Sequence, residues 1–206
     1  RHMSEPTPIG LTLGDPAGIG PEVATAALSV MPLDIPIRTY GPRPMVEELA
    51  SRFARVIPIA TTNTLDGVMI GRYNKASGVA SVNALEAAFD DLARGIVCAL
   101  VTGPVCKTAL QDAQLPFPGQ TEWVASVLGV SRFAMMLAGP RLRVALVTTH
   151  LALRDVPDRL SRESIASTVA LTADFLQRFE ALLNPRIGVL ALNPHASDQG
   201  RFGHEE

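Results

Sequence analysis

Apolar residues follow two spacings along the chain, and the two spacings alternate. Short uninterrupted apolar runs predict buried strands, whereas apolar residues that recur every three to four positions predict amphipathic helices. The predicted strands cover 9–13, 35–40, 55–59, 96–101, 133–137, 142–148 and 186–192. The first predicted helix begins at Pro21, and the second covers about 44–53. The third contains Val82, Leu85, Phe89 and Leu92 and ends at Gly95. The fourth covers 105–111, the fifth begins at about 121, and the sixth covers 162–183. Alternation of this kind predicts an α/β fold.

Two of these segments carry more specific expectations. Residues 96–101 are apolar throughout, which is typical of a central strand covered on both faces. The segment 162–183 is the longest predicted helix. Its expected inward side chains are Ile165, Val169, Phe175, Leu176 and Phe179.

Composition excludes several classes of protein. The chain has 206 residues, of which 47% are hydrophobic and 18% charged, as expected for a globular protein. The 18 Lys and Arg residues are scattered and the formal net charge is −2, so we expect no nucleic-acid partner. No apolar run reaches the ~18 residues of a membrane span and no signal segment is visible, which favours a cytoplasmic protein without membrane contact. Cys98 and Cys106 form neither a disulfide framework nor a zinc motif.

Two glycine-containing turns follow predicted strands. The first, Gly14-Asp15-Pro16-Ala17-Gly18-Ile19-Gly20-Pro21-Glu22, allows a ligand to approach backbone N–H groups, but it lacks the dinucleotide pattern G-x-G-x-x-G. An ordinary tight turn explains it equally well. The second runs from Thr102 to Lys107 at a strand end, where α/β proteins bind ligands. Lys107 is therefore a candidate for contact with an anion or for proton transfer, with a solvated surface lysine as the alternative.

A third candidate lies at the start of the helix near 121. Gln120 offers an amide and Thr121 a hydroxyl beside free helix N–H groups, a combination suited to a phosphate. The simpler interpretation is that Thr121 caps the helix.

Two histidines follow predicted strands at equivalent places. His150 follows 142–148, and His195 follows 186–192. A single histidine at a strand end is more often structural, but imidazole is a common metal ligand, so a matched pair favours a shared divalent metal. Two ligands do not complete such a site, and a third donor, Asp198 or a group outside this chain, is required.

Six ordered blocks of the sequence resemble the 4-hydroxythreonine-4-phosphate dehydrogenase family. They are Gly14-Asp15-Pro16-Ala17-Gly18-Ile19-Gly20-Pro21-Glu22, Thr102-Gly103-Pro104-Val105-x-Lys107, Phe117-Pro118-Gly119-x-Thr121-Glu122, Met135-Met136-Leu137-Ala138, Val147-Thr148-Thr149-His150-x-x-Leu153-Arg154 and Leu192-Asn193-Pro194-His195-Ala196. The resemblance implies two α/β/α domains with a cleft between them, as in isocitrate and isopropylmalate dehydrogenases, and a homodimer. It also implies that residues 1–206 are the N-terminal two thirds of such an enzyme, with the domain boundary near 110–135, so that the fold is incomplete at its C-terminal side.

The same resemblance implies a chemistry. The family oxidises a phosphorylated hydroxy amino acid with NAD or NADP and then decarboxylates it, in pyridoxal phosphate synthesis. A divalent metal (Zn, Mg, Co or Mn) is held by three histidines, two of which match His150 and His195. The third histidine and much of the cofactor site lie in the C-terminal part, outside this chain. Lys107 is the candidate catalytic residue, and Gln120 and Thr121 are the candidate substrate-binding residues.

Two positions depart from the family pattern. Gln120 and Cys106 stand where the family has histidines, and neither replaces the positive charge that histidine can carry. Relatives of the family oxidise sugar-acid phosphates or aromatic cis-dihydrodiols, so the resemblance implies either of these as an alternative substrate. A truncated, non-catalytic relative that binds a ligand or dimerises is the alternative function. Fold analogy also admits a phosphate acyltransferase, against which the paired histidines argue.

Three expectations follow for the structure and the activity. His150 and His195 should lie close enough to share a metal. Gln120, Thr121 and Lys107 should line the same cleft as that metal. A protein that ends at Glu206 should lack dehydrogenase activity, because the third metal ligand and part of the cofactor site are missing.

Overall fold

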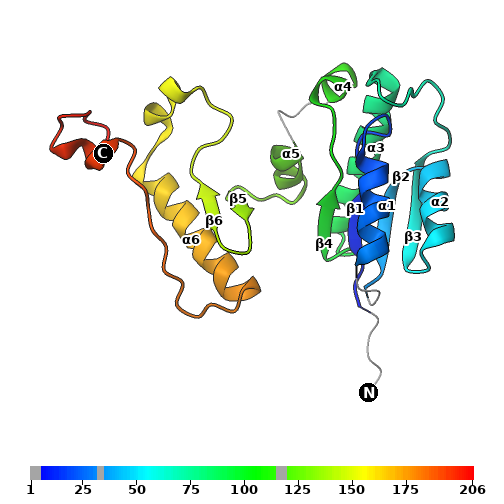
Figure 1. Ribbon diagram of the computed structural model, residues 1–206, viewed down its shortest axis with the longest axis horizontal. Coiled ribbons are helices and arrows are strands. Elements are labelled where there is room, and N and C mark those ends of the chain that lie inside the picture. The colour runs from blue at the N-terminus through cyan, green and yellow to red at the C-terminus, as the bar shows by residue number, and fades with distance from the viewer. Residues whose placement is uncertain (1–5, 32–34, 115–119) are drawn as a thin grey trace. The chain divides into compact units, whose positions relative to one another are not determined.

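The computed structural model describes residues 6–31, 35–114 and 120–206, which form two compact units, Arg1–Gly129 and Val130–Glu206 (Figure 1). The elements of the first unit are β1 (Ile9–Thr12), α1 (Gly20–Val30), β2 (Ile37–Pro42), α2 (Arg43–Arg52), β3 (Val56–Thr62), α3 (Lys75–Ala93), β4 (Ala99–Thr102), α4 (Lys107–Asp112) and α5 (Gln120–Val127). Those of the second are β5 (Met135–Ala138), β6 (Arg143–Leu146), the 3₁₀ turns η1 (Leu153–Asp155) and η2 (Pro157–Arg159), α6 (Arg162–Phe179) and the 3₁₀ turn η3 (Pro194–Asp198). The predicted α/β fold class is confirmed.

The first unit is built on a parallel four-stranded sheet in the order β3-β2-β1-β4. One core cluster joins α1 and α2 to the sheet through Leu28, Val46 and Ile37. A second cluster joins Tyr40 of β2 to Ala84 of α3. Because side chains three positions apart on a strand point to opposite faces, Ile37 and Tyr40 show that α1 and α2 cover one face and α3 the other. The unit is therefore a three-layer α/β/α sandwich.

The predicted central strand at 96–101 is wrong in its place and its burial. Among the described residues, the observed strand β4 lies at the edge of the sheet, and Val101 is 55% exposed. Only Leu100 packs against the cluster beneath α3. Ala99 and Val101, whose side chains point away from the face of Leu100, are both exposed.

Side-chain hydrogen bonds fix helix ends in this unit, one set local in sequence and the other from a distant residue. At the start of α3, Asn74 and Ser77 form a reciprocal capping box in which Asn74 Oδ1 accepts from the Ser77 backbone N–H at 2.9 Å. At the end of α1, the Arg55 guanidinium donates to the carbonyls of Leu28 at 2.6 Å and Met31 at 3.1 Å. These bonds satisfy backbone groups that a helix leaves free at its ends.

A buried charged network ties β2 to α3. Asp91 Oδ2 accepts from Tyr40 Oη at 2.8 Å and from Arg38 Nε at 3.1 Å, and Arg38 Nη2 lies 3.0 Å from the same oxygen. Tyr40 is fully buried. Burial, followed by the hydrogen bond to Asp91, raises the pKa of Tyr40 above its ordinary value.

The second unit contains the antiparallel pair β5–β6 and helix α6. Arg143 of β6 and Glu180, which follows α6, form a two-pronged ion pair with Nε to Oε1 at 2.9 Å. The helix predicted at 162–183 ends earlier, at Phe179, and is one residue shorter than α3. The expected inward position of Phe179 is wrong, since this side chain is 71% exposed at the last turn. Leu176 is buried as expected.

The strand predicted at 186–192 is also wrong. This segment has no ladder with any described residue, and Leu190 within it is 93% exposed. An apolar run indicates burial, but a strand additionally needs an edge to pair with. Within the described ranges, no helix has the length and apolar character that a membrane span requires.

Candidate functional site

The carboxyl ends of β1 and β4 meet at the point where the strand order of the sheet reverses. Ligands bind open α/β sheets at such points. Here the two loops touch, because the Asp15 backbone N–H donates to the Pro104 carbonyl at 2.9 Å. A Cβ placed on Gly14, which has φ +75°, lies 2.3 Å from that same oxygen. The glycines therefore serve close packing of the two loops, and the interpretation of the first motif as a tight turn is the one that this geometry supports.

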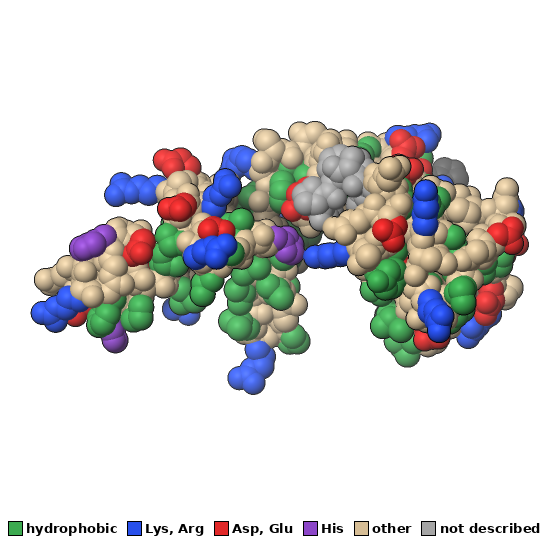
Figure 2. Space-filling model, turned by 90° about the horizontal axis from the view of Figure 1, so that it is seen from above, with side chains coloured by type: hydrophobic (Ala, Val, Ile, Leu, Met, Phe, Trp, Pro, Cys, Tyr) green, Lys and Arg blue, Asp and Glu red, His purple; other side chains and the backbone are tan. Residues whose placement is uncertain are grey.

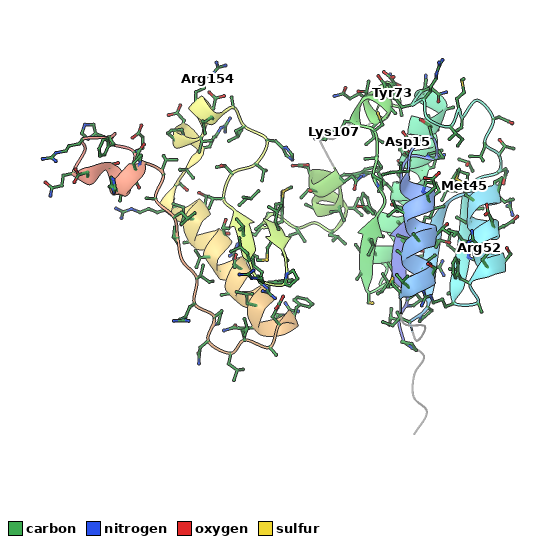
Figure 3. The ribbon with its side chains drawn as sticks, in the orientation of Figure 1. Asp15, Met45, Arg52, Tyr73, Lys107 and Arg154 are labelled. Carbon is green, nitrogen blue, oxygen red and sulfur yellow. The ribbon has the colours of Figure 1, made fainter. Side chains whose placement is uncertain are left out.

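Asp15 carries a buried carboxylate beneath this contact (Figure 3). Its Oδ1 accepts from the Ala17 backbone N–H at 2.8 Å. Its Oδ2 lies 3.4 Å from Ser77 Oγ, in the capping box of α3. The carboxylate thus connects the loop after β1 with the start of α3.

Lys107 is the first residue of α4 and is exposed (Figure 3). Among the described residues, no carboxylate lies within 4.0 Å of its ammonium. The helix itself is firmly seated, since a Cβ on Gly78 of α3 lies 2.0 Å from the Ala109 carbonyl. An exposed cation on a fixed helix at a strand end can meet an anionic ligand.

Gln120 and Thr121 begin α5 and are half-buried. Trp123, one turn further, packs edge-on against Phe89 of α3 with ring centroids 5.0 Å apart. That contact fixes the start of α5 to the same helix that supports α4. The part of the phosphate motif before Gln120 lies outside the described residues.

His150 and His195 both belong to the second unit and are exposed. His150 comes four residues after the end of β6, with φ +57°. His195 lies in η3 with φ +54°, and its ring centroid is 6.1 Å from that of Phe202. The expected equivalence of the two histidines as strand ends is wrong, since the described residues between α6 and His195 form no strand.

The backbone around His195 is held by a side-chain network. Asn193 Nδ2 donates to Ser197 Oγ at 3.2 Å and to Glu205 Oε2 at 2.8 Å. This hydrogen bond from Asn193 lowers the pKa of the Glu205 carboxyl. The residues from His195 through Gln199 all have positive φ. Such a left-handed run of residues other than glycine is strained and persists only where its surroundings hold it.

The predicted residues therefore fall into two groups. Lys107, Gln120 and Thr121 lie in the first unit, and His150 and His195 in the second. Within the described ranges, no three His, Cys, Asp or Glu side chains are grouped so that they could hold a metal ion. That a metal joins the two histidines stays a prediction, as does a cleft shared by all five residues.

Two residues with evident roles were missed by sequence reasoning. Asp15 lies inside the first glycine motif, and an ionisable side chain between the glycines is the sequence signal that could have singled it out. Asn193 lies two residues before His195. Its position directly before Pro194 is the sequence feature that could have singled it out. Charged side chains elsewhere are interspersed by sign on the face that Figure 2 shows, which agrees with the scattered sequence positions.

The first unit is a parallel sheet between two helical layers, and candidate ligand residues lie where its strands end. This arrangement defines the class of open α/β proteins, in which ligands bind at the carboxyl ends of the strands. Residues 15–206 match the model of the family described as pyridoxal phosphate biosynthetic protein PdxA, and the chain belongs to this family.

Relatives and solved structures agree with this membership. The chain is 39% identical to a 4-hydroxythreonine-4-phosphate dehydrogenase of Desulfosudis oleivorans over 96% of its length and 65% of the relative's. It is 34% identical to one of Sulfurihydrogenibium sp., covering 96% and 66%. The crystal structure of 4-hydroxythreonine-4-phosphate dehydrogenase from Klebsiella pneumoniae matches with a TM-score of 0.79 at 28% identity, over 97% of this chain and 68% of that one. The chain thus spans about two thirds of the length of its relatives.

Proposed function

We propose that this chain is part of a dehydrogenase that oxidises 4-hydroxythreonine 4-phosphate, or a closely related phosphorylated hydroxy acid, with decarboxylation. The observation that carries the proposal is the family match over residues 15–206 together with relatives named for that activity. NAD or NADP is the proposed hydride acceptor, a divalent metal the proposed ion, and a homodimer in the cytoplasm the proposed state.

Lys107, Gln120 and Thr121 are the proposed contacts of the substrate. An ammonium, an amide and a hydroxyl supply hydrogen-bond donors for phosphate or carboxylate oxygens. Lys107 is exposed without a carboxylate partner in the described part of the chain, so its charge is available to an anion. Lys107 is also the proposed proton-transfer group.

His150 and His195 are the proposed metal ligands. The described residues do not form a three-donor set. The chemistry of the two histidines fits a divalent ion, and the third donor that it requires is Asp198 or a group outside this chain.

The substrate contacts are tested by binding. We expect Lys107→Ala and Thr121→Ala each to weaken affinity for 4-hydroxythreonine 4-phosphate by about tenfold, the equivalent of one lost charge-assisted hydrogen bond. Thr108→Ala is the matched control, because Thr108 is an exposed hydroxyl residue on the same helix as Lys107. Parent-like affinity in both variants contradicts the assignment.

The metal ligands are tested by zinc or manganese titration of single variants. We expect His150→Ala and His195→Ala each to lower affinity by about tenfold or more, whereas His204→Ala serves as the control. Unchanged affinity in either of the first two removes that residue from the site.

Activity is tested by following reduced cofactor. The verified 206-residue chain is mixed with NAD or NADP, a divalent metal and one of three substrates: 4-hydroxythreonine 4-phosphate, threonate 4-phosphate or a cis-dihydrodiol. We expect no turnover by this chain and turnover by a protein that carries the same sequence within a chain of its relatives' length. The substrate that is oxidised decides between the phosphate and dihydrodiol alternatives.

A further inference from the structure

Asp15 is a buried carboxylate that the proposed function does not use. Only 4% of its surface is exposed. In the part of the chain that the structure describes, no Lys, Arg or His side chain forms an ion pair with it. Burying an unpaired charge is unfavourable, and a neutral side chain satisfies a tight turn equally well. The charge and the place of Asp15 therefore call for a reason beyond the turn.

The carboxylate holds two segments at once. Oδ1 accepts from the Ala17 N–H at 2.8 Å and so fixes the loop after β1. Oδ2 faces the Ser77 hydroxyl at 3.4 Å. That hydroxyl has one proton, which it shares between Asp15 and the Asn74 carbonyl at 3.1 Å.

The backbone of Asp15 holds a third segment. Its N–H donates to the Pro104 carbonyl at 2.9 Å, and Pro104 precedes Lys107 by three residues. The backbone at Gly103 packs closely against β1 and its loop, because a Cβ placed on Gly103 lies 2.6 Å from the backbone of Leu13. The conformation of the loop after β1 thus fixes where the loop after β4 begins its path to Lys107.

The start of α3 supports the same helix from the other side. Ser77, which faces Asp15, is adjacent to Gly78, whose close approach to the Ala109 carbonyl seats α4. Asp15 therefore contacts both supports of α4, the loop that leads into it and the helix against which it packs.

We propose that Asp15 is a positioning residue for Lys107. Its carboxylate fixes the two supports of α4 and so determines the position of the Lys107 ammonium near the carboxyl end of β4. This inference rests on the proposed function for the role of Lys107, but the placement itself is independent of that role.

The test uses the chain's unusually low lysine count. The sequence contains two lysines, Lys75 and Lys107. Reductive methylation with ¹³C-formaldehyde gives each lysine one dimethylammonium signal, and Lys107→Arg assigns the signal of Lys107 by its loss. Lys75 provides a second signal in the same spectrum.

Three variants probe the carboxylate in steps. Asp15→Ala removes both contacts, Asp15→Asn keeps the acceptor for Ala17 but loses the acceptor for Ser77, and Ser77→Ala removes only the hydroxyl. We expect the Lys107 signal to move most in Asp15→Ala and less in the other two. Tyr40→Phe is the control, because it weakens a buried hydrogen bond in the same unit without contact to Asp15. It should leave the Lys107 signal in place.

The second readout is the response of the Lys107 signal to inorganic phosphate. We expect the concentration for half of the full displacement to rise about tenfold in Asp15→Ala, since misplacing a binding group by about 1 Å has large effects. If the alanine variant does not fold, Asp15→Asn and Ser77→Ala carry the same comparison.

The outcomes separate the two proposals. A lowered melting temperature in the Asp15 and Ser77 variants with an unmoved Lys107 signal overturns the positioning role and leaves Asp15 as a turn stabiliser only. A Lys107 signal that moves in the Asp15 variants, but does not respond to phosphate or substrate in the parent, supports positioning and contradicts the proposed role of Lys107 in binding.

Discussion

For two neighbouring aspartates of α3, we expect substitution by alanine to change stability by very different amounts. Asp91 is 11% exposed and pairs with Arg38, which is 23% exposed, while it also accepts from the buried Tyr40 hydroxyl. Asp90 and its partner Arg94 are 66% and 64% exposed. Both residues lie in the same helix, so replacing either by alanine brings the same gain in helix propensity. The difference between the two variants therefore isolates the buried network.

The magnitude follows from what each substitution leaves behind. Asp91→Ala leaves the Tyr40 hydroxyl buried without this acceptor, which costs about 1–3 kcal/mol, and Arg38 without its carboxylate. Breaking a buried ion pair costs about 3–5 kcal/mol, and the partial exposure of Arg38 places the expected total near 3 kcal/mol. Asp90→Ala removes an exposed pair worth at most about 0.5 kcal/mol.

Urea unfolding followed by tryptophan fluorescence measures this difference in the first structural unit, which contains both aspartates. The chain has one tryptophan, and Trp123 packs on Phe89 of the same helix that carries both aspartates. We expect the free energies of unfolding of the two variants to differ by about 3 kcal/mol, with Tyr40→Phe about 1 kcal/mol below the parent. A difference below about 1 kcal/mol between Asp90→Ala and Asp91→Ala refutes the reasoning.

Three further predictions concern pH, a helix contact and an ion pair. In a Tyr73→Phe background Tyr40 is the only tyrosine, and we expect its phenolate absorbance to appear only with unfolding. Because the pKa of Tyr40 is raised in the folded state, its contribution to stability is retained below the ordinary tyrosine pKa of about 10 and falls as pH rises beyond it. Unfolding measured as a function of pH checks this. Gly78→Ala should lower stability by about 2 kcal/mol despite better helix propensity, because its Cβ meets α4 at 2.0 Å, whereas Gly188→Ala, with nothing within 4 Å, should be near neutral by thermal unfolding. Arg143→Lys should destabilise the second unit by about 1 kcal/mol, measured by circular dichroism during urea unfolding, since lysine cannot reproduce the two-pronged pair; an unchanged midpoint contradicts this.

The elements predictable from sequence are those whose neighbours are close along the chain. The strand predicted at 9–13 is β1, the helix at 44–53 is α2, and the strand at 55–59 begins β3 within one residue. The strands β1, β2 and β3 follow one another along the chain in the order in which they pair in the sheet. The apolar spacing of each segment therefore matches the surroundings in which it packs. Apolar spacing thus sufficed where each element packs on its sequence neighbour.

The failures arise where an element depends on a distant partner. The apolar character of 96–101 does not show that, among the described residues, β4 pairs with β1 alone and leaves Val101 exposed. The same character at 186–192 does not supply an edge for pairing. For the site, residue type singled out Lys107 and both histidines, but the link from Asp15 to Ser77 joins residues 62 positions apart and had no local signal.

The contact between the β1 and β4 loops also bears on cofactor binding. In dinucleotide-binding α/β folds, the pyrophosphate enters at the switch point beside a glycine turn. Here that space is filled, because the Asp15 N–H already donates to the Pro104 carbonyl and Gly14 leaves no gap between the loops. The Asp15 N–H donates to Pro104, and the N–H groups of Ala17 and Gly18 donate to Asp15 itself, so these three donors of the turn are already used within the protein. The glycines of this motif therefore act in the packing of the two loops.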